Sequence, residues 1–222
     1  MRPVIAILVL GMLAGGASAR DSVELVYISE VLYDAGSNSP PPFIELYYAG
    51  KKGDNLDISG WRIRIKVKDT VETVTLPASA KIPGCGFYLI GREADRGTWS
   101  SSRFPYKPDF YCTASMDYKP GEGGVQLIRS GGGADAVGWG RVIIPFYEEV
   151  PHLGVREGHS LERKSGEAHN ETKGNSYDTD NNLNDFRDRS SPQPQNIHSP
   201  LEYPAASTEN DAWGRIKAMY YG

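Results

Sequence analysis

Residues 42–68 constrain the fold most strongly, because apolar and polar side chains alternate there on both sides of a single turn. A period of two is typical of a β-strand that is buried on one face and exposed to water on the other. Residues 49–57, between the two halves, contain the Gly, Asn and Asp that favour a turn. We therefore predict a β-hairpin. Its second strand places Trp61, Ile63, Ile65 and Val67 on the buried face and Arg62, Arg64, Lys66 and Lys68 on the exposed face.

Short runs rich in β-branched and aromatic residues recur along the chain, and Gly, Pro, Asn or Ser separates them. Many short strands with a turn signal about every ten residues favour an all-β sandwich. A chain of about 200 residues is long enough for one such domain with a tail. The strands are predicted at 24–33, 43–48, 59–68, 71–77, 86–91, 124–129, 134–139 and 159–163.

Residues 1–19 have the pattern of a secretory signal peptide. Arg2 precedes an apolar run over residues 4–16, and residues 17–19 (Ala-Ser-Ala) have the small-x-small pattern of a signal-peptidase site. The apolar run is shorter than the ~20 residues that span a bilayer as a helix. We predict cleavage, with an uncleaved anchor as the alternative. The protein is then secreted, periplasmic or at the cell surface, with no transmembrane span after cleavage.

The charge balance is mildly acidic, with 24 Lys and Arg against 28 Asp and Glu. Loss of Arg2 with the signal peptide leaves 23 against 28, a net charge of −5. This balance disfavours nucleic acid and anionic membranes as partners. The basic face of residues 62–68 is a local exception that suits contact with a polyanion. We favour the alternative, in which these cations keep an edge strand from pairing with another chain.

Cys85 and Cys112 are predicted to form a disulfide, because exported proteins use cysteine pairs in this way more often than for metals. Such a crosslink would stabilise the fold by about 3–4 kcal/mol. Two free, buried thiols are the alternative.

Two connections between predicted strands are unusually long, at residues 92–123 and 141–158. Trp99 and Tyr106 in the first connection are candidates for a surface that stacks on a sugar or docks a protein. We favour the alternative that both loops fold back and cap the open ends of the sandwich.

The chain becomes polar over residues 165–198, which predicts an ordered loop or an extended segment that closes the domain. The remaining residues, 199–222, form a tail. Apolar side chains within residues 208–221 recur at helical spacing and predict a short helix that packs on the domain or binds a partner.

Further motifs follow the hairpin in a characteristic order, and together they resemble the lamin-tail domain (LTD) family in its prokaryotic secreted type. The resemblance implies an immunoglobulin-like β-sandwich over residues 20–198 that acts as a mostly non-catalytic extracellular interaction module. The insertion at 92–123 and the cysteine pair depart from the family pattern. The motifs are ISEVLY at 28–33, LPASAKIPGCGFYLI at 76–90, GVQLIRSGGGADAVGWG at 124–140, EGHSLER at 157–163, DTDNNLNDF at 178–186 and SPQPQN at 191–196.

Asp178, Asp180 and Asn182 have the one-three-five spacing of a calcium loop. Position six is Leu183 rather than Gly, and position twelve is Arg189 rather than Glu. We therefore favour a cluster of Asx turns that satisfies backbone donors, with calcium as the alternative. No other cofactor is predicted.

The sequence shows no catalytic constellation. The four histidines lack a paired ligand spacing, and Ser160 does not lie in a G-x-S-x-G motif. Glu30 and Glu45 are expected to lie close together on neighbouring strands, where we favour a structural role over acid–base chemistry.

We predict a secreted or cell-surface binding or scaffolding module that is not an enzyme. Its expected partner is a protein or a polysaccharide at the cell surface. Two alternatives remain open: an accessory or cryptic component of an extracellular hydrolase or nuclease, and a purely structural envelope protein.

Overall fold

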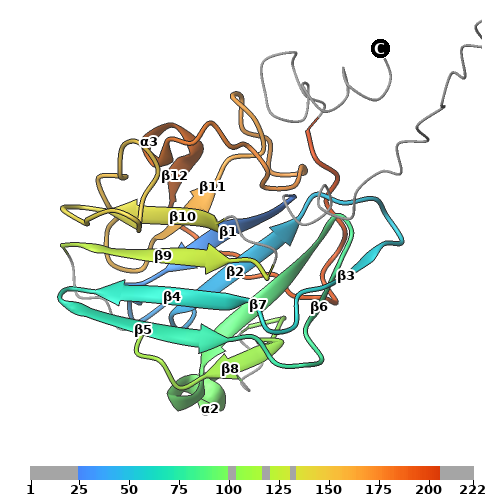
Figure 1. Ribbon diagram of the computed structural model, residues 1–222, viewed down its shortest axis with the longest axis horizontal. Helices are drawn as coiled ribbons and strands as arrows, with labels where there is room; N and C mark the ends of the chain where they lie inside the picture. The colour runs from blue at the N-terminus through green and yellow to red at the C-terminus, as the bar shows by residue number, and fades with distance from the viewer. Residues whose placement is uncertain (1–24, 100–103, 117–120, 131–133, 206–222) are drawn as a thin grey trace, which may run out of the picture.

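The computed structural model describes residues 25–99, 104–116, 121–130 and 134–205 (Figure 1). Within these residues the chain forms β-sheets with only short helical turns, so the all-β prediction is confirmed. The predicted signal peptide and the predicted C-terminal helix lie outside the described residues. The helical turns are η1 (Glu93–Asp95), α2 (Arg96–Trp99) and α3 (Asn182–Asp185).

The strands form two larger sheets and one small sheet. All the pairings are antiparallel except that between β7 and β8, the two strands at one side of the largest sheet. In spatial order, the six-stranded sheet contains β12 (Phe186–Arg189), β11 (Ser160–Arg163), β1 (Val26–Leu32), β2 (Phe43–Tyr48), β7 (Gly86–Arg92) and β8 (Phe110–Cys112). The four-stranded sheet contains β10 (Ala134–Trp139), β9 (Gly123–Ile128), β4 (Arg62–Val67) and β5 (Thr70–Thr75), and the small sheet contains β3 (Asn55–Asp57) and β6 (Lys81–Pro83).

The two larger sheets share one apolar core. The alternation in β4 holds in part: Ile63 and Ile65 are buried in this core and Arg62 is exposed, as predicted. Lys66, predicted to be exposed, is only 8% exposed, and Arg64 is half-buried. The core also contains Ile28, Leu46 and Ile90 from the six-stranded sheet and Val125, Leu127 and Val137 from the four-stranded sheet.

The two predicted strands of residues 42–68 are both present, but they do not pair with each other. β2 pairs with β1 and β7, whereas β4 pairs with β5 and β9 in the other sheet. The hairpin prediction is therefore wrong: the intervening segment crosses from one sheet to the other and contains β3 on the way. Because β4 lies inside its sheet, the interpretation of its cations as edge protection is also wrong.

Residues 141–158 fold back onto the domain as predicted, but Phe146 and His152 lie against the outer face of a sheet and not at an open end of the sandwich. They lie on the face of β9 and β10 that points away from the core, where two glycines leave room for them. A Cβ atom on Gly124 would lie 2.7 Å from the Phe146 Cβ, and one on Gly138 would lie 2.4 Å from the Phe146 carbonyl oxygen. The backbone of His152 also donates to the Gly138 carbonyl at 2.8 Å.

The disulfide prediction is wrong. Cys85 directly precedes β7, and Cys112 is the register partner of Arg92 at the other end of that strand. A strand rises about 3.3 Å per residue, so roughly 20 Å separate the two cysteines. A disulfide needs Cα atoms within about 7 Å of each other. Both thiols are free and buried.

We predict that a thiol reagent labels neither cysteine in the folded protein and labels both after denaturation, because each residue is only 3% exposed. The mass of the alkylated protein measures this directly. Adding a reductant should leave the thermal midpoint of unfolding unchanged. The arrangement of two free thiols would be contradicted by a denatured protein that the reagent does not label and whose thermal midpoint falls when reductant is added.

Candidate functional site

An open groove of about 880 Å³ lies where four segments that are distant in the sequence meet. Its walls come from residues 36–40, 104–106, 157–159 and 190–195. The lining combines aromatic rings and prolines with Ser, Asn and Gln side chains, and Glu157 and His159 are its ionic members. The volume is in the range of small-molecule and cofactor sites.

The walls at residues 36–40 and 157–159 are joined to each other and to the core by the contacts of neighbouring residues. The Gly158 amide donates to the Asp34 carbonyl at 2.6 Å, and Gly158 has a φ of +79°, which suits glycine. The hydroxyl of Tyr33 accepts the Val155 amide at 2.8 Å, and its ring stacks on Trp139 at a centroid distance of 4.1 Å. These contacts give the groove a rigid frame.

The two aromatic residues predicted to bind a ligand have different positions. Tyr106 lines the groove and is partly exposed. Trp99 is fully buried, with its ring 6.3 Å from that of Phe43 and 5.5 Å from that of Phe104. Trp99 therefore supports the wall from behind through Phe104, and only Tyr106 of the pair is placed to touch a ligand.

The wall at residues 190–195 rests on two carboxyl groups. Glu30 of β1 and Glu45 of β2 are register partners, and each is at most 2% exposed. The amide of Gln195 donates to the Glu45 carboxylate at 2.6 Å, and the Ser160 hydroxyl donates to Glu30. The two glutamates are adjacent, as predicted, and their side chains hold backbone and hydroxyl groups in place.

Burial raises the pKa of Glu30 to about 8, and the negative charge of Glu162 adds to the effect. Burial also raises the pKa of Glu45 well above its ordinary value, and Glu30 is the next largest cause. Two carboxyl groups so close together in a dry environment retain a proton at neutral pH. The pair is therefore a hydrogen-bonding unit beneath the groove wall.

We predict that the free energy of unfolding falls by a few kcal/mol between pH 5 and pH 8. In this range the folded protein holds protons on Glu30 and Glu45 that the unfolded chain has already lost, so raising the pH favours unfolding. Glu148, whose pKa burial raises to about 9, acts in the same direction. His152 and His169 act in the opposite direction near pH 6, because burial lowers their pKa.

The measurement is chemical denaturation across this pH range. Glu30→Gln, which mimics the protonated acid, should reduce the slope, whereas the control Glu167→Gln at an exposed position should leave it unchanged. Equal slopes in Glu30→Gln and the parent protein would contradict the assignment.

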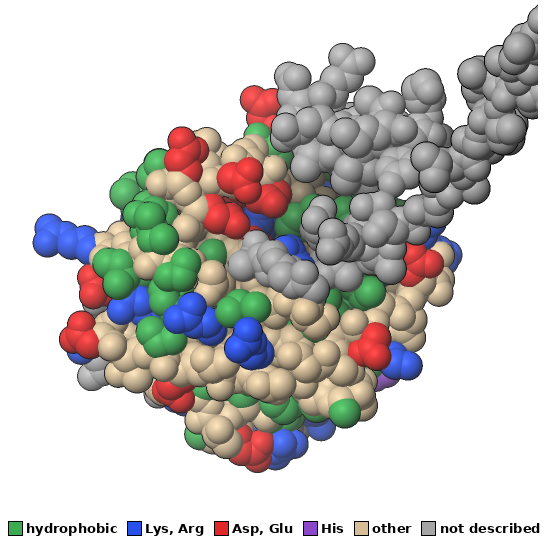
Figure 2. Space-filling view, in the orientation of Figure 1, with side chains coloured by type: hydrophobic (Ala, Val, Ile, Leu, Met, Phe, Trp, Pro, Cys, Tyr) green, Lys and Arg blue, Asp and Glu red, His purple; other side chains and the backbone are tan. Residues whose placement is uncertain are grey.

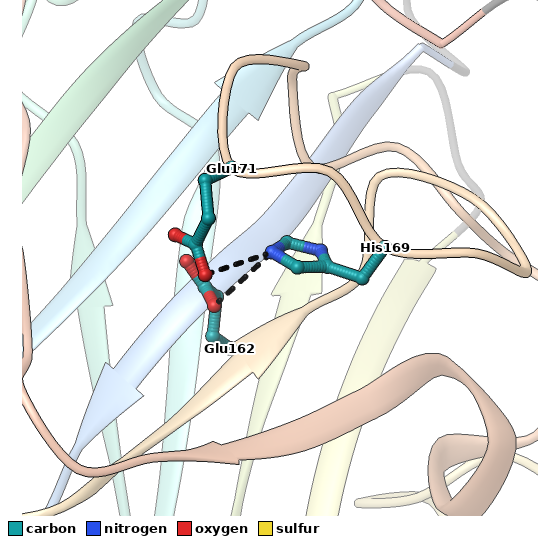
Figure 3. Close-up of side chains that lie close together, drawn as sticks. All are labelled: Glu162, His169 and Glu171. Atoms are coloured by element: carbon teal, nitrogen blue, oxygen red, sulfur yellow. Dashed lines mark ion pairs between the residues drawn. The ribbon is translucent and has the colours of Figure 1, made fainter.

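A second cluster, made of Glu162, His169 and Glu171, involves β11 and the loop that follows it (Figure 3). The His169 Nε2 atom points at both carboxylates, 3.4 Å from Glu171 and 4.0 Å from Glu162. Arg187 and Arg189 of β12 each form ion pairs with both glutamates. The negative charges of the two glutamates are therefore already paired with two guanidinium groups.

The hydrogen bonding of His169 indicates a structural role. Its Nδ1 atom accepts the Ser165 amide at 3.3 Å, so the neutral ring carries its proton on Nε2, the atom that faces the carboxylates. Burial lowers the pKa of His169, which favours the neutral ring. A nitrogen that bears a proton has no lone pair for a metal. The cluster acts as a latch that ties residues 164–174 to β11 and β12.

A third ionic group lies inside the protein around Arg163 of β11. This fully buried guanidinium bonds Asp135 of β10 at 2.6 Å, Asp178 at 3.1 Å and the Ile28 carbonyl at 3.0 Å. Glu148, Asp178 and Asp185 have carboxylate oxygens within 4.8 Å of one another on the same side. Arg163 is the cation that these acids surround.

The residues of the predicted calcium loop do not share one cation position. Asp178 bonds Arg163, and Asp180 is exposed. The Asn182 Oδ1 atom accepts the amides of Gly138 and Glu148, at 2.9 and 3.2 Å, which uses both of its lone pairs. These contacts correspond to the favoured interpretation, in which the loop satisfies backbone donors.

Three cations of the basic face, Arg62, Arg64 and the buried Lys66, lie on β4, and Lys68 directly follows the strand. Arg62 and Lys68 are exposed. Arg64 donates to Gln126 at 3.0 Å and lies over the Phe146 ring at 5.0 Å, and the Lys66 ammonium donates to the Lys68 carbonyl. The basic face and the groove involve separate sets of residues.

Comparison with known proteins does not assign this chain to a group: no protein-family model matches it, and no curated protein matches it. In the part of the chain that the structure describes, no helix is long and apolar enough to cross a membrane. Function is therefore inferred from the groove and the surfaces themselves.

Proposed function

We propose that this protein is a secreted or cell-surface, non-catalytic binding module of the lamin-tail type, and that its groove holds a neutral polysaccharide. Two observations support the family part of the proposal. The motifs follow the order of that family in the sequence, and two sheets around one core are the framework that an immunoglobulin-like sandwich requires.

The chemistry of the groove lining carries the ligand part. The rings of Phe104 and Tyr106 offer flat apolar surfaces of the kind that pack on the C–H face of a sugar. Serine hydroxyls and the exposed side-chain amide of Gln193 offer neutral donors and acceptors for sugar hydroxyls. The open groove leaves room for a polymer that is longer than the groove itself.

Hydrolysis in the same groove is the second candidate, and one contact favours it. His159 lies in the lining, and its Nδ1 atom is 2.5 Å from the carboxylate of Asp188. A carboxylate orients a catalytic histidine in this manner. Ser190 and Ser191 also line the groove. Among the described residues, however, the His159 ring has Asp188 as its sole hydrogen-bond partner, and no hydroxyl is activated by it.

We predict that one of three soluble neutral polysaccharides, a β-glucan, a mannan or a chitin oligosaccharide, binds the protein in isothermal calorimetry. Tyr106→Ala should weaken this binding about tenfold, because it removes a stacking ring. The control is Tyr203→Ala, which removes a partly exposed tyrosine outside the groove.

Analysis of the same mixtures for released sugars separates the two candidates. If the parent protein releases sugars and the His159→Ala variant does not, hydrolysis replaces binding as the proposed function. Absence of binding to all three polymers, or equal binding by Tyr106→Ala and the parent, would contradict the assignment of the groove to neutral polysaccharide.

A further inference from the structure

We propose that a second surface, formed by the loop at residues 142–153 and the adjacent basic face of β4, docks onto a lipid bilayer with anionic headgroups. We call residues 142–153 the apolar loop. Ile143, Ile144 and Leu153 in this loop are 63%, 72% and 84% exposed. They are the three most exposed large hydrophobic side chains among the residues that the structure describes. This surface is independent of the groove.

The apolar loop is held firmly, so these side chains are displayed by the fold. Phe146 is 2% exposed and fills the space above Gly124 and Gly138. Its amide donates to the Ile143 carbonyl at 3.2 Å, which closes the turn that presents Ile143 and Ile144. At the other end of the loop, the His152 amide bonds the Gly138 carbonyl. A rigid loop with aliphatic side chains outside and an aromatic anchor inside indicates a contact surface.

The exposed apolar surface continues beyond the turn. Val150 in the loop and Leu183 in α3 are 38% and 41% exposed, and the Leu183 amide donates to the Val150 carbonyl at 3.1 Å. Glu149, the exposed acid between these elements, is held by the Asn181 side-chain amide at 2.8 Å. The apolar loop and α3 therefore present one aliphatic surface.

Cations border this surface. Arg64 is partly exposed and lies over the Phe146 ring. The exposed Lys68 follows Val67, whose register partner Gly123 pairs with Trp139 just before the loop. Arg141 is exposed at the start of the loop. Figure 2 shows Lys and Arg side chains beside hydrophobic ones on this face of the molecule. The chain as a whole has a net charge of −4, so this concentration of cations opposes the overall balance.

Aliphatic side chains at a turn with cations beside them fit a bilayer surface. The side chains insert among acyl chains, and the Lys and Arg groups contact lipid phosphates. A stable protein–protein interface buries roughly 800 Å² on each partner and has aromatic residues at its centre. The exposed side chains of this surface, Ile143, Ile144, Val150, Leu153 and Leu183, include no aromatic residue, and the Phe146 ring beneath them is buried.

Co-sedimentation with vesicles tests the proposal. We expect the protein to bind vesicles of phosphatidylcholine and phosphatidylglycerol in equal parts, and to bind vesicles of phosphatidylcholine alone more weakly. Added salt should weaken the first interaction, because it screens the cations. Replacing both isoleucines, Ile143→Ser with Ile144→Ser, should weaken binding at least tenfold. The double variant Lys68→Glu with Arg141→Glu should weaken it similarly, at two exposed positions beside the loop.

The matched control is Ile197→Ser with Leu201→Ser, which replaces two partly exposed aliphatic residues outside this surface and should bind as the parent does. Thermal midpoints establish that each variant is folded. Absence of binding to the anionic vesicles would overturn the proposal, as would equal binding by the isoleucine variant. A concentration-dependent dimer that the isoleucine variant abolishes, without vesicle binding, would assign the surface to self-association instead. None of these results bears on polysaccharide binding in the groove.

Discussion

The buried guanidinium group of Arg163 is the interaction on which the rest of this structure depends. It joins β11 to β10 through Asp135, to β1 through the Ile28 carbonyl, and to the segment before α3 through Asp178. Its planar group also lies over the Phe186 ring at 4.6 Å. A buried charge is tolerated only when it is paired and hydrogen-bonded, and loss of one partner typically costs about 3–5 kcal/mol. The donors of this one side chain thus connect the two larger sheets at the end where the loops lie.

The apolar loop depends on this connection. Asp185, 3.8 Å from Arg163, accepts the amides of Thr179 and Asn181 and so shapes the turn that places Asn182. Asn182 in turn bonds Gly138 and Glu148, one residue on the sheet and one in the loop above it. The apolar loop is therefore positioned by an ion pair between Arg163 and Asp185 and by the hydrogen bonds that follow from Asp185. On the other side of β11, Ser160 contacts Glu30 beneath the groove wall. Glu162 contacts Arg187 in the cluster that also contains His169 and Glu171.

Local patterns in the sequence predicted the strands well and their pairing less well. The alternation in β4 correctly placed Ile63 and Ile65 in the core, because period two is a property of the strand itself. Sheet membership depends on partners far away in the sequence, so the hairpin of residues 42–68 was assigned to one sheet when its strands belong to two. The disulfide prediction was wrong for the same reason, because the spacing of the two cysteines in the sequence contains no information about the strand that separates their thiols.

The candidate site was less accessible to sequence analysis than the fold. The adjacency of Glu30 and Glu45 followed from two neighbouring strands, but the groove is built from four distant segments that share no local pattern. The acidic spacing at residues 178–182 did not reveal that the oxygen of Asn182 already accepts two amides. One signal for Arg163 was present, since period two places it on the same face as the buried Leu161.

Hydrogen–deuterium exchange of the Arg163→Lys variant tests most directly whether this residue organises the loops. Lysine keeps the charge and loses the planar set of donors. We expect faster exchange at the amides that depend on the network, those of Ile28, Gly138, Glu148 and Thr179, while amides between β4 and β5 keep their protection. Unchanged exchange at the first group, or an equal loss of protection in both groups, would contradict the central role of Arg163.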